Sequence, residues 1–180
     1  MEQVHGLFDD PTGDFAHNPE PLPEHLTVIC EEVRRTSADV GFVVDPDVDR
    51  LAIVDEHGAF FGEEYTLVSI ADYLLSLNGG GNTVSNLSST RALRDVPLRH
   101  GGSYHAAAVG EVNVVTKMKE VNALIGGEGN GGVIYPELHY GRDALVGIAL
   151  FLTLLAKDGR SVHTLRSTYP NYYMSKQRVE

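Results

Sequence analysis

Cysteine is almost absent from this sequence, which contains only Cys30. A single cysteine cannot form a disulfide within the chain, and its helical spacing from Leu26, Ile29 and Val33 predicts a core residue. No apolar run approaches the roughly 20 residues that cross a bilayer, and the first residues lack the basic and apolar parts of a signal peptide. We therefore expect a cytoplasmic protein without a membrane partner.

Basic residues are also few, because 14 Lys and Arg stand against 25 Asp and Glu, which gives a formal net charge of −11. Nucleic acids need basic surfaces for their phosphates, so a nucleic-acid partner is excluded. Hydrophobic residues make up 42% of the 180 and can bury a sizeable core. By length alone the chain forms one or two domains.

A segment rich in aspartate follows an apolar run at residues 41–44. It reads Asp45-Pro46-Asp47-Val48-Asp49-Arg50. Side chains alternate faces in an extended segment, so the three aspartates can point the same way. Three carboxylates within about 5 Å repel one another unless a cation lies between them. Oxygen ligands suit a hard divalent ion, and Asp45, Asp47 and Asp49 are therefore candidate Mg²⁺ ligands.

Two other interpretations compete for this loop. A solvated acidic turn without a metal is the simplest, and the loop alone leaves it open. An EF-hand would place the three aspartates at positions 1, 3 and 5 and Glu56 at position 12. It would also need glycine at position 6, where Arg50 stands, and helices on both sides, where the pattern predicts strands.

A second loop is rich in glycine and contains one carboxylate. It reads Gly127-Glu128-Gly129-Asn130-Gly131-Gly132. It matches the dinucleotide fingerprint G-x-G-x-x-G, but that fingerprint opens a helix, and the residues that follow here predict a strand. A plain hairpin turn stays open as an interpretation. The functional one is a loop whose backbone approaches a sugar closely, while Glu128 accepts hydrogen bonds from hydroxyls.

The rest of the chain alternates between helical and extended patterns. The spacing of apolar residues predicts helices at 23–37, 63–77, 89–96, 111–121, 142–156 and 162–169. It predicts strands at 40–44, 51–55, 83–87, 103–107, 123–125 and 133–135. The fold class is therefore α/β, with mixed β-sheets and helices packed on them.

The order of the two loops resembles one family, the α-D-phosphohexomutases, which include phosphoglucomutase, phosphomannomutase and phosphoglucosamine mutase. Residues 45–50 are similar to the family's D-x-D-x-D-R metal loop. Residues 127–132 stand where the family has its sugar-recognition loop, G-E-x-S-G-H. Residues 11–21 are similar to the His-, Asn- and Pro-rich segment that precedes the metal loop. The resemblance covers essentially the whole chain.

The resemblance implies that this is an internal fragment of a four-domain protein. Residues 1–61 would be the end of domain 2 with its metal loop, and residues 62–169 would be domain 3 with its sugar loop. Residues 170–180 would lead towards domain 4. The family's phosphoserine loop, T-A-S-H-N-P, and its phosphate clamp, R-x-S-G-T-E-P, do not occur here. We therefore expect domains 1 and 4 to be missing partners, and this chain alone to be inactive.

The resemblance also implies a reaction, the exchange of a phosphoryl group between O6 and O1 of a hexose phosphate. A phosphoserine outside this chain would donate the group, a hexose 1,6-bisphosphate would be the intermediate, and Mg²⁺ at the three aspartates would be the cofactor. Arg50 would act beside the transferring group. The implied substrate-binding residues are Glu128, Asn130, Gly127, Arg142 and Arg91.

The chain departs from the family pattern at two places. Asn130 and Gly132 stand where the family loop has Ser and His, and Ala108 stands where many relatives carry Lys. We expect the lost charge to be supplied elsewhere, with four candidates: Arg50, Glu111, Lys117 and Arg142. Asp143 has two interpretations, because it can favour the positive end of the following helix or line the sugar cleft.

The amino-acid sequence is most similar to the phosphoglucosamine mutases of Bacteroidetes-type bacteria. That similarity implies conversion of glucosamine 6-phosphate to glucosamine 1-phosphate. Phosphomannomutase and phosphoglucomutase stay as alternatives, because the sequence shows no residue that specifically requires an amino group at C2 of the sugar. An alternative of another class is a non-catalytic, metal-dependent module that binds sugar phosphates.

Overall fold

The computed structural model describes residues 3–173 and contains two β-sheets with helices packed on them, which confirms the α/β class. Residues 3–22 form no helix or strand. The expected linker at 170–180 lies outside the described residues from position 174 onward. No helix within residues 3–173 is long and apolar enough to cross a membrane.

The smaller sheet is an antiparallel pair, β1 (Val40–Val44) and β2 (Leu51–Asp55). Helix α1 (Thr27–Thr36) packs against it at Gly41, where a Cβ would lie 2.8 Å from a Val33 methyl group. The flanking strands exclude the EF-hand, which needs helices on both sides of its loop. Cys30 on this helix is only half-buried, and burial raises the pKa of its thiol.

The expected helix at 23–37 is in fact two elements. A 3₁₀ turn, η1 (Pro23–His25), comes first, and Leu26 separates it from α1 with non-helical dihedral angles. The Leu26 amide donates to the Pro23 carbonyl, three residues back, so the α-helical ladder cannot run through this position.

The larger sheet has four strands in the order β4-β3-β5-β6. They are β3 (Asn82–Asn86), β4 (Ser103–Ala107), β5 (Ala123–Glu128) and β6 (Gly132–Ile134). The first three are parallel, and β6 pairs with β5 as an antiparallel hairpin. Parallel neighbours have their carboxyl ends at one edge of the sheet, where ligands of open α/β sheets bind.

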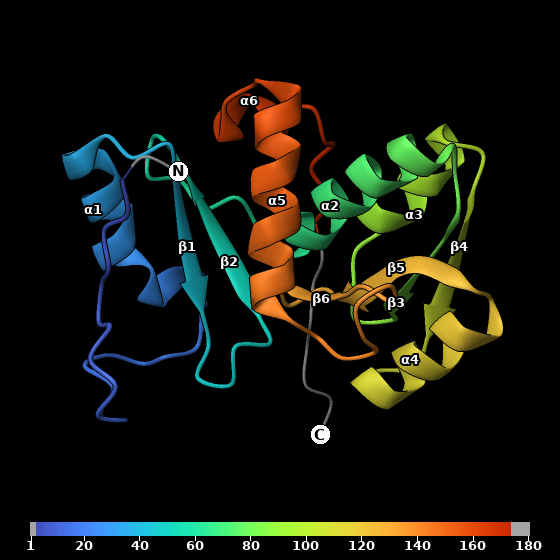
Figure 1. Cartoon of the computed structure of the whole chain (residues 1–180), viewed down its shortest axis with the longest axis horizontal. Helices are drawn as coiled ribbons and strands as arrows, with labels where there is room; N and C mark the ends of the chain where they lie inside the picture. The colour runs from blue at the N-terminus through green and yellow to red at the C-terminus, as the bar shows by residue number, and fades with distance from the viewer. Residues whose placement is uncertain (1–2, 174–180) are drawn as a thin grey trace.

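Helices cover both faces of this sheet (Figure 1). Helix α4 (Glu111–Glu120) lies on one face and closes a small core around Val84, Val114 and Met118. Helices α2 (Glu63–Asn78) and α3 (Ala92–Arg99) lie on the other face. The resulting α/β/α layers bury the apolar surface of the parallel strands, as parallel sheets require.

The two sheets share one hydrophobic core through α2 and α5 (Ala144–Asp158). Phe151 of α5 lies between the sheets, edge-on to Phe61 at a ring distance of 5.3 Å and to Phe42 at 6.1 Å. Leu51 and Ile53 of β2 join the same cluster. Because this core is continuous, the loops that leave the two sheets are held at fixed positions relative to each other.

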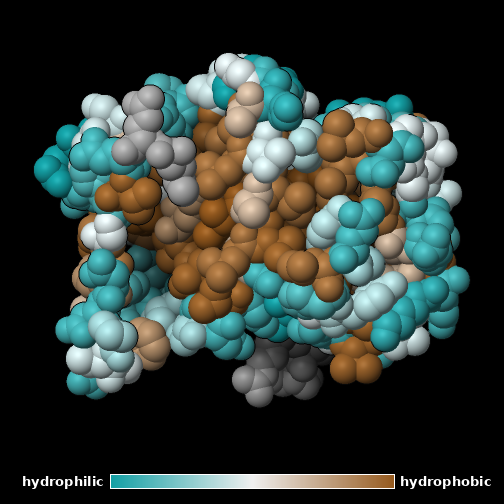
Figure 2. All heavy atoms as spheres, viewed as in Figure 1, coloured by the Kyte–Doolittle hydropathy of each residue, from teal (hydrophilic) through white to brown (hydrophobic). Residues whose placement is uncertain are grey.

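Part of the apolar surface of α5 is not covered by the other residues in the range 3–173. Leu145 is exposed, and Ile148 and Leu150 are only partly buried. Figure 2 shows apolar side chains gathered over the middle of this view, where α5 crosses it. The last helix, α6 (Val162–Ser167), packs next to β2. An uncovered apolar helix face of this kind is typical of a surface that contacts other protein.

Helix α3 begins three residues later than expected and runs through Pro97 to Arg99. The residues before it form a turn, because the Ser88 amide and the Ser89 hydroxyl both donate to the Asn86 side chain. The Thr90 amide donates to Glu64 of α2. Proline has a helical φ, but Pro97 has no N–H to donate to Leu93 and crowds the Leu93 carbonyl, and the helix ends two residues after it.

Candidate metal and sugar site

The aspartate loop makes a sharp turn between β1 and β2. Val48 adopts a φ of +58°, which is unusual for a β-branched residue. Its amide donates to the Asp45 carbonyl at 3.0 Å, and its own carbonyl accepts from the Ala144 amide at 3.0 Å. The loop is therefore closed on itself and is also attached to the first residue of α5.

Asp45 is the buried anchor of this loop, with 2% of its surface exposed. One carboxylate oxygen accepts the amides of Asp49 and Arg50, each at 3.0 Å, and the other accepts the Arg50 side chain at 2.6 Å. Burial opposes ionisation, but the hydrogen bonds from Arg50 and Asp49 outweigh it and hold the pKa of Asp45 below its ordinary value. Asp45 is thus kept ionised.

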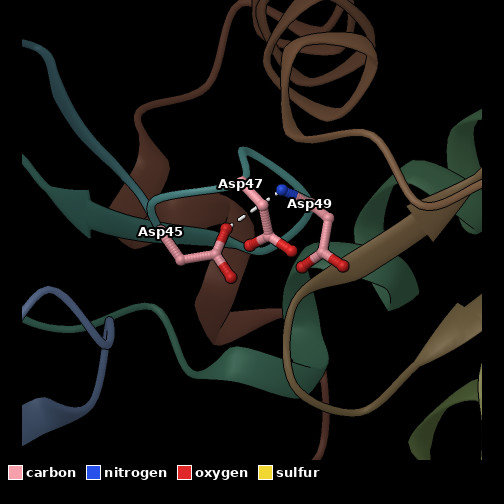
Figure 3. A group of neighbouring side chains, drawn as sticks. All are labelled: Asp45, Asp47 and Asp49. Carbon is pink, nitrogen blue, oxygen red and sulfur yellow. Dashed lines mark hydrogen bonds between the residues drawn. The ribbon is translucent and has the colours of Figure 1, made fainter.

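The three aspartates meet as the sequence predicts. Figure 3 shows their carboxylates pointing the same way, and each offers an oxygen within 4.8 Å of the others. Burial raises the pKa of Asp49 to about 6, opposed by the charge of Arg142 and helped by those of Asp45 and Asp47. One buried oxygen of Asp49 accepts no hydrogen bond. That oxygen lies 3.8 Å from the Arg50 Nε, and this set of hard oxygen donors fits Mg²⁺.

The glycine loop is the tip of the β5–β6 hairpin. Strand β5 extends three residues beyond its expected end, so Gly127 and Glu128 are strand residues and only 129–131 form the turn. The hairpin is therefore real, and a strand follows the turn instead of the helix that a dinucleotide site needs.

The hairpin tip contacts the end of the aspartate loop through the backbone. The Leu51 amide donates to the Gly131 carbonyl at 3.2 Å. Gly131 has a φ of +88°, and a Cβ there would lie 2.4 Å from the Leu51 carbonyl oxygen. Only glycine fits this contact, because a side chain would meet both backbone strain and a clash.

Glu128 is buried at the carboxyl edge of the larger sheet, with 7% of its surface exposed. One of its oxygens accepts the Asn86 side chain at 2.6 Å and the Gly110 amide at 3.3 Å. Its other oxygen pairs with Arg142 at 3.1 Å. The end of β3, the loop after β4 and the segment just before α5 therefore position this carboxylate.

Arg142 joins the two loops directly. Besides Glu128, its guanidinium pairs with Asp49 of the aspartate loop and with Glu111 at the start of α4, the latter at 2.9 Å. Its side chain is 18% exposed. Asp143 next to it is the N-cap of α5 and accepts a hydrogen bond from the Val146 amide at 3.0 Å. Of its two interpretations, the structure shows the one at the helix start.

The other predicted residues do not take part in the ion pairs of Arg142. Arg50 pairs with Asp45 and, at 2.8 Å, with Glu20 in the segment before α1. The Asn130 side chain folds back to accept the Gly132 amide at 3.3 Å. Arg91 is exposed at the start of α3, and its side chain makes no hydrogen bond or ion pair within residues 3–173. Lys117 pairs with Glu120 on α4.

Asn86, Gly110 and Glu20 are partners of the charged groups that were not predicted from the sequence. Asn86 is the last residue of β3 and Gly110 is in the loop after β4. Their position at the ends of parallel strands was the available signal, because such ends converge on one edge. Glu20 gave no signal beyond its place in a segment rich in proline.

Two family models match the chain. Residues 62–172 match phosphoglucomutase/phosphomannomutase α/β/α domain III, and residues 2–58 match α/β/α domain II. A phosphoglucomutase/phosphomannomutase from Thermococcus kodakarensis is 37% identical over 169 residues, and a protein named "Probable phosphoglucosamine mutase" from Methanopyrus kandleri is 32% identical over 179. The alignments cover 93% and 99% of this chain.

One solved structure has the same fold over most of the chain. A phosphoglucomutase/phosphomannomutase family protein from Burkholderia thailandensis superposes with a TM-score of 0.78 at 30% identity, covering 86% of this chain and 34% of that one. The chain spans 37% and 40% of the lengths of the two sequence relatives. On this evidence, the chain belongs to the phosphoglucomutase/phosphomannomutase family.

Proposed function

We propose that this chain supplies the metal loop and the sugar-binding loop of a Mg²⁺-dependent phosphohexomutase, which exchanges a phosphoryl group between O6 and O1 of a hexose phosphate. The observation that carries the proposal is the junction at Arg142. There an acidic triad that fits Mg²⁺ meets a buried carboxylate on a glycine hairpin. A phosphorylated sugar needs a metal ion near its phosphate and a hydrogen-bond acceptor near its hydroxyls, and one sugar phosphate must reach both.

The chain's own residues would bind and orient. Asp45, Asp47 and Asp49 would hold Mg²⁺, which when bound neutralises charge on a transferring phosphoryl group. Arg50 keeps Asp45 ionised and would stand beside that group. Glu128, already fixed by Asn86, would accept hydrogen bonds from sugar hydroxyls.

The remaining contacts would come from both the backbone and side chains. Gly127 leaves the β5 backbone bare, and a Cβ there would lie 2.0 Å from the Gly132 carbonyl oxygen, so the hairpin stays thin where a sugar approaches. Asn130 would rotate away from the Gly132 amide to contact a hydroxyl. Arg91 would reach the phosphate, since its exposed guanidinium has no other partner within residues 3–173.

The phosphoryl donor would lie outside this chain. We place the end of domain 2 at residues 1–61, domain 3 at 62–169 and the start of a linker at 170, and the family-model matches at 2–58 and 62–172 support a boundary near residue 61. Domains 1 and 4 of the parent protein would carry the phosphoserine and the phosphate clamp. The 180 residues alone would then bind a hexose 1,6-bisphosphate without turning it over.

We infer glucosamine 6-phosphate as the first candidate substrate, with glucosamine 1-phosphate as product. The name of the Methanopyrus kandleri relative supports it. The Thermococcus kodakarensis relative, which is more similar, is named for glucose and mannose phosphates and supports the alternative. The similarity to Bacteroidetes-type enzymes stays a prediction, and so does the cytoplasmic location.

A two-step titration tests the proposal. Backbone amides of labelled protein are followed by NMR, first with Mg²⁺ and then with glucosamine 1,6-bisphosphate. We expect Mg²⁺ to shift residues 45–50, and the sugar then to shift residues 126–132. A folded protein that shows neither response would contradict the proposal. Turnover by this chain alone would contradict the assignment of the phosphoryl donor to other domains.

Two variants make the titration specific. Glu128→Gln should weaken bisphosphate binding about tenfold, because a charged acceptor is lost from a buried site, while Mg²⁺ binding stays within about twofold. Glu137→Gln is the matched control, since Glu137 accepts a hydrogen bond from the Tyr135 hydroxyl away from both loops. Equal effects of the two variants would contradict a role for Glu128.

A further inference from the structure

Arg142 carries one positive charge among three carboxylates that belong to three different elements. Its Nε pairs with Glu111 at 2.9 Å, one terminal nitrogen with Glu128 at 3.1 Å, and the other with Asp49. Guanidinium has five N–H groups, so at least one terminal N–H beyond these contacts can donate to another oxygen. The cluster as a whole keeps an excess of negative charge.

Gly132 provides the space for the Arg142 side chain. A Cβ at position 132 would lie 2.4 Å from the Arg142 Cδ and 3.1 Å from its Cγ. Both atoms belong to the stem of the arginine, which its three ion pairs hold in place. The Arg142 conformation therefore depends on the absence of a side chain at position 132, where the resembled family loop has His.

Asp49 cannot fully satisfy two cations at once. It is one of the three candidate metal ligands, and Arg142 already pairs with one of its oxygens, while the other accepts no hydrogen bond and lies 3.8 Å from the Arg50 Nε. A divalent ion at the triad would reduce the attraction between Asp49 and Arg142, because it adds two positive charges next to the same carboxylate. The guanidinium would then be attracted more strongly to an incoming anion.

We propose that Arg142 is a positioning residue that couples the two loops: it neutralises Asp49 in the absence of a divalent ion, and it turns its guanidinium to the phosphate of the ligand when that ion is bound. This inference rests on the proposed function and deepens it. It assigns to Arg142 the positive charge that the sugar loop lacks at position 132. It also makes metal binding a precondition for strong binding of a sugar phosphate.

The proposal predicts effects of opposite sign on two ligands. Without Arg142 the triad loses a competing cation, so Mg²⁺ should bind more tightly. A sugar phosphate should bind more weakly, because its cationic partner is gone. A purely structural role would weaken both, since loosening the junction would disorder both loops. The two signs therefore separate the two explanations.

Calorimetric titration of wild type and Arg142→Gln tests these signs. We expect Mg²⁺ affinity to rise about fivefold in the variant, and glucose 6-phosphate affinity at saturating Mg²⁺ to fall about tenfold. Arg160→Gln is the matched control, because Arg160 pairs with Asp158 at the far end of α5 and should change neither value. Unchanged or weaker Mg²⁺ binding by folded Arg142→Gln would overturn the inference.

A second pair of variants tests the dependence on Gly132. Gly132→Ala should displace the arginine stem and weaken glucose 6-phosphate binding about threefold or more. In an Arg142→Ala background the same change should have a much smaller effect, because the clashing Cγ and Cδ are gone and only the Asn130 Oδ1 remains close, at 3.2 Å. Equal effects of Gly132→Ala in both backgrounds would overturn the steric coupling of the two residues.

The outcomes also separate this inference from the function on which it rests. Absence of Mg²⁺ binding by both wild type and Arg142→Gln would overturn the metal site and therefore both proposals. Mg²⁺ binding with equal affinity by both proteins would leave the proposed function standing and overturn the role of Arg142 alone. Tighter binding by the variant would support both.

Discussion

The two loops that meet at Arg142 keep their shapes by opposite means. The aspartate loop depends on side chains, because the carboxylate of Asp45 accepts two backbone amides and a guanidinium within one turn. The glycine hairpin depends on the absence of side chains, because its backbone touches Leu51 where a Cβ would clash. One loop is specified by charge and the other by space.

This difference decides how each loop should respond to substitution. In the aspartate loop, the removal of a charge leaves buried partners unsatisfied, while small changes in shape matter less. In the hairpin there is no room for even one added methyl group. Glu128 is the only charged residue of this loop, so few substitutions there would remove a charge. The comparison therefore predicts electrostatic failure on one side and steric failure on the other.

The largest effect should follow Asp45→Asn. The new amide would place N–H donors against the Arg50 guanidinium or against two backbone amides, and Arg50 would keep only its pairs with Glu20 and Asp49. We expect the free energy of unfolding to fall by about 3 kcal/mol and Mg²⁺ affinity to fall about a hundredfold. Urea unfolding and calorimetric titration measure the two quantities.

Asp47→Asn is the matched control for that change. Asp47 belongs to the same triad but is exposed, so its loss should leave the free energy of unfolding within about 0.5 kcal/mol of wild type. Mg²⁺ binding should still weaken, because a ligand charge is lost. If both variants were equally unstable, the buried hydrogen bonds of Asp45 would not be what holds the loop.

A smaller effect should follow Gly131→Ala in the hairpin. The added methyl group meets the Leu51 carbonyl oxygen and a φ of +88°, so we expect a loss of about 2 kcal/mol in the free energy of unfolding. Because Leu51 directly follows the aspartate loop, Mg²⁺ binding should weaken as well. Thermal or urea unfolding, with a Mg²⁺ titration, measures both.

Gly159→Ala separates backbone strain from the clash. Gly159 ends α5 with a φ of +75°, and no atom lies within 4 Å of the position that a Cβ would take. Its replacement should cost about 1 kcal/mol from backbone strain alone and should not change Mg²⁺ binding. Equal losses for the two variants would mean that the contact between Gly131 and Leu51 adds nothing.

The same contrast explains what could be predicted from sequence. The aspartates lie within five residues of one another, so their convergence followed from the alternation of side chains in an extended segment. The end of α1 and the strand starts were predicted to within one residue for the same local reason, whereas the expected helix start at 23 falls in η1 and not in α1. The α/β class followed from the order of these local patterns.

Features that depend on distant residues were not predicted, although the converging ends of the parallel strands gave a signal for the partners of Glu128. The start of α3 is displaced because Glu64, 26 residues earlier, accepts the Thr90 amide. The partners of Glu128 lie 42 residues away at Asn86 and 18 away at Gly110. The fit between Gly132 and the Arg142 stem is a property of packing between a hairpin and a helix start, and spacing along the chain contains no trace of it.

The last prediction concerns the helix start that both loops share. Asp143 caps α5 directly after Arg142, and Asp143→Ala should lower the free energy of unfolding by about 1 kcal/mol at pH 7. Burial opposes ionisation of Asp143, but the Val146 amide and His139 outweigh it and hold its pKa below the ordinary value. Its stabilising effect is therefore complete above the unfolded-state pKa of about 4.

Acidification makes this last comparison decisive. As the pH falls through the folded-state pKa of Asp143, the wild type should lose the contribution of the ionised cap, and the difference between the two proteins should shrink. Urea unfolding at pH 7 and at several values below pH 4 measures it. A difference that stays constant would mean that the cap acts without its charge.

The Mg²⁺ affinity of Asp143→Ala at pH 7 tests the role of Arg142. A large change in this affinity would mean that the helix start, and not Arg142 itself, fixes the junction between the two loops.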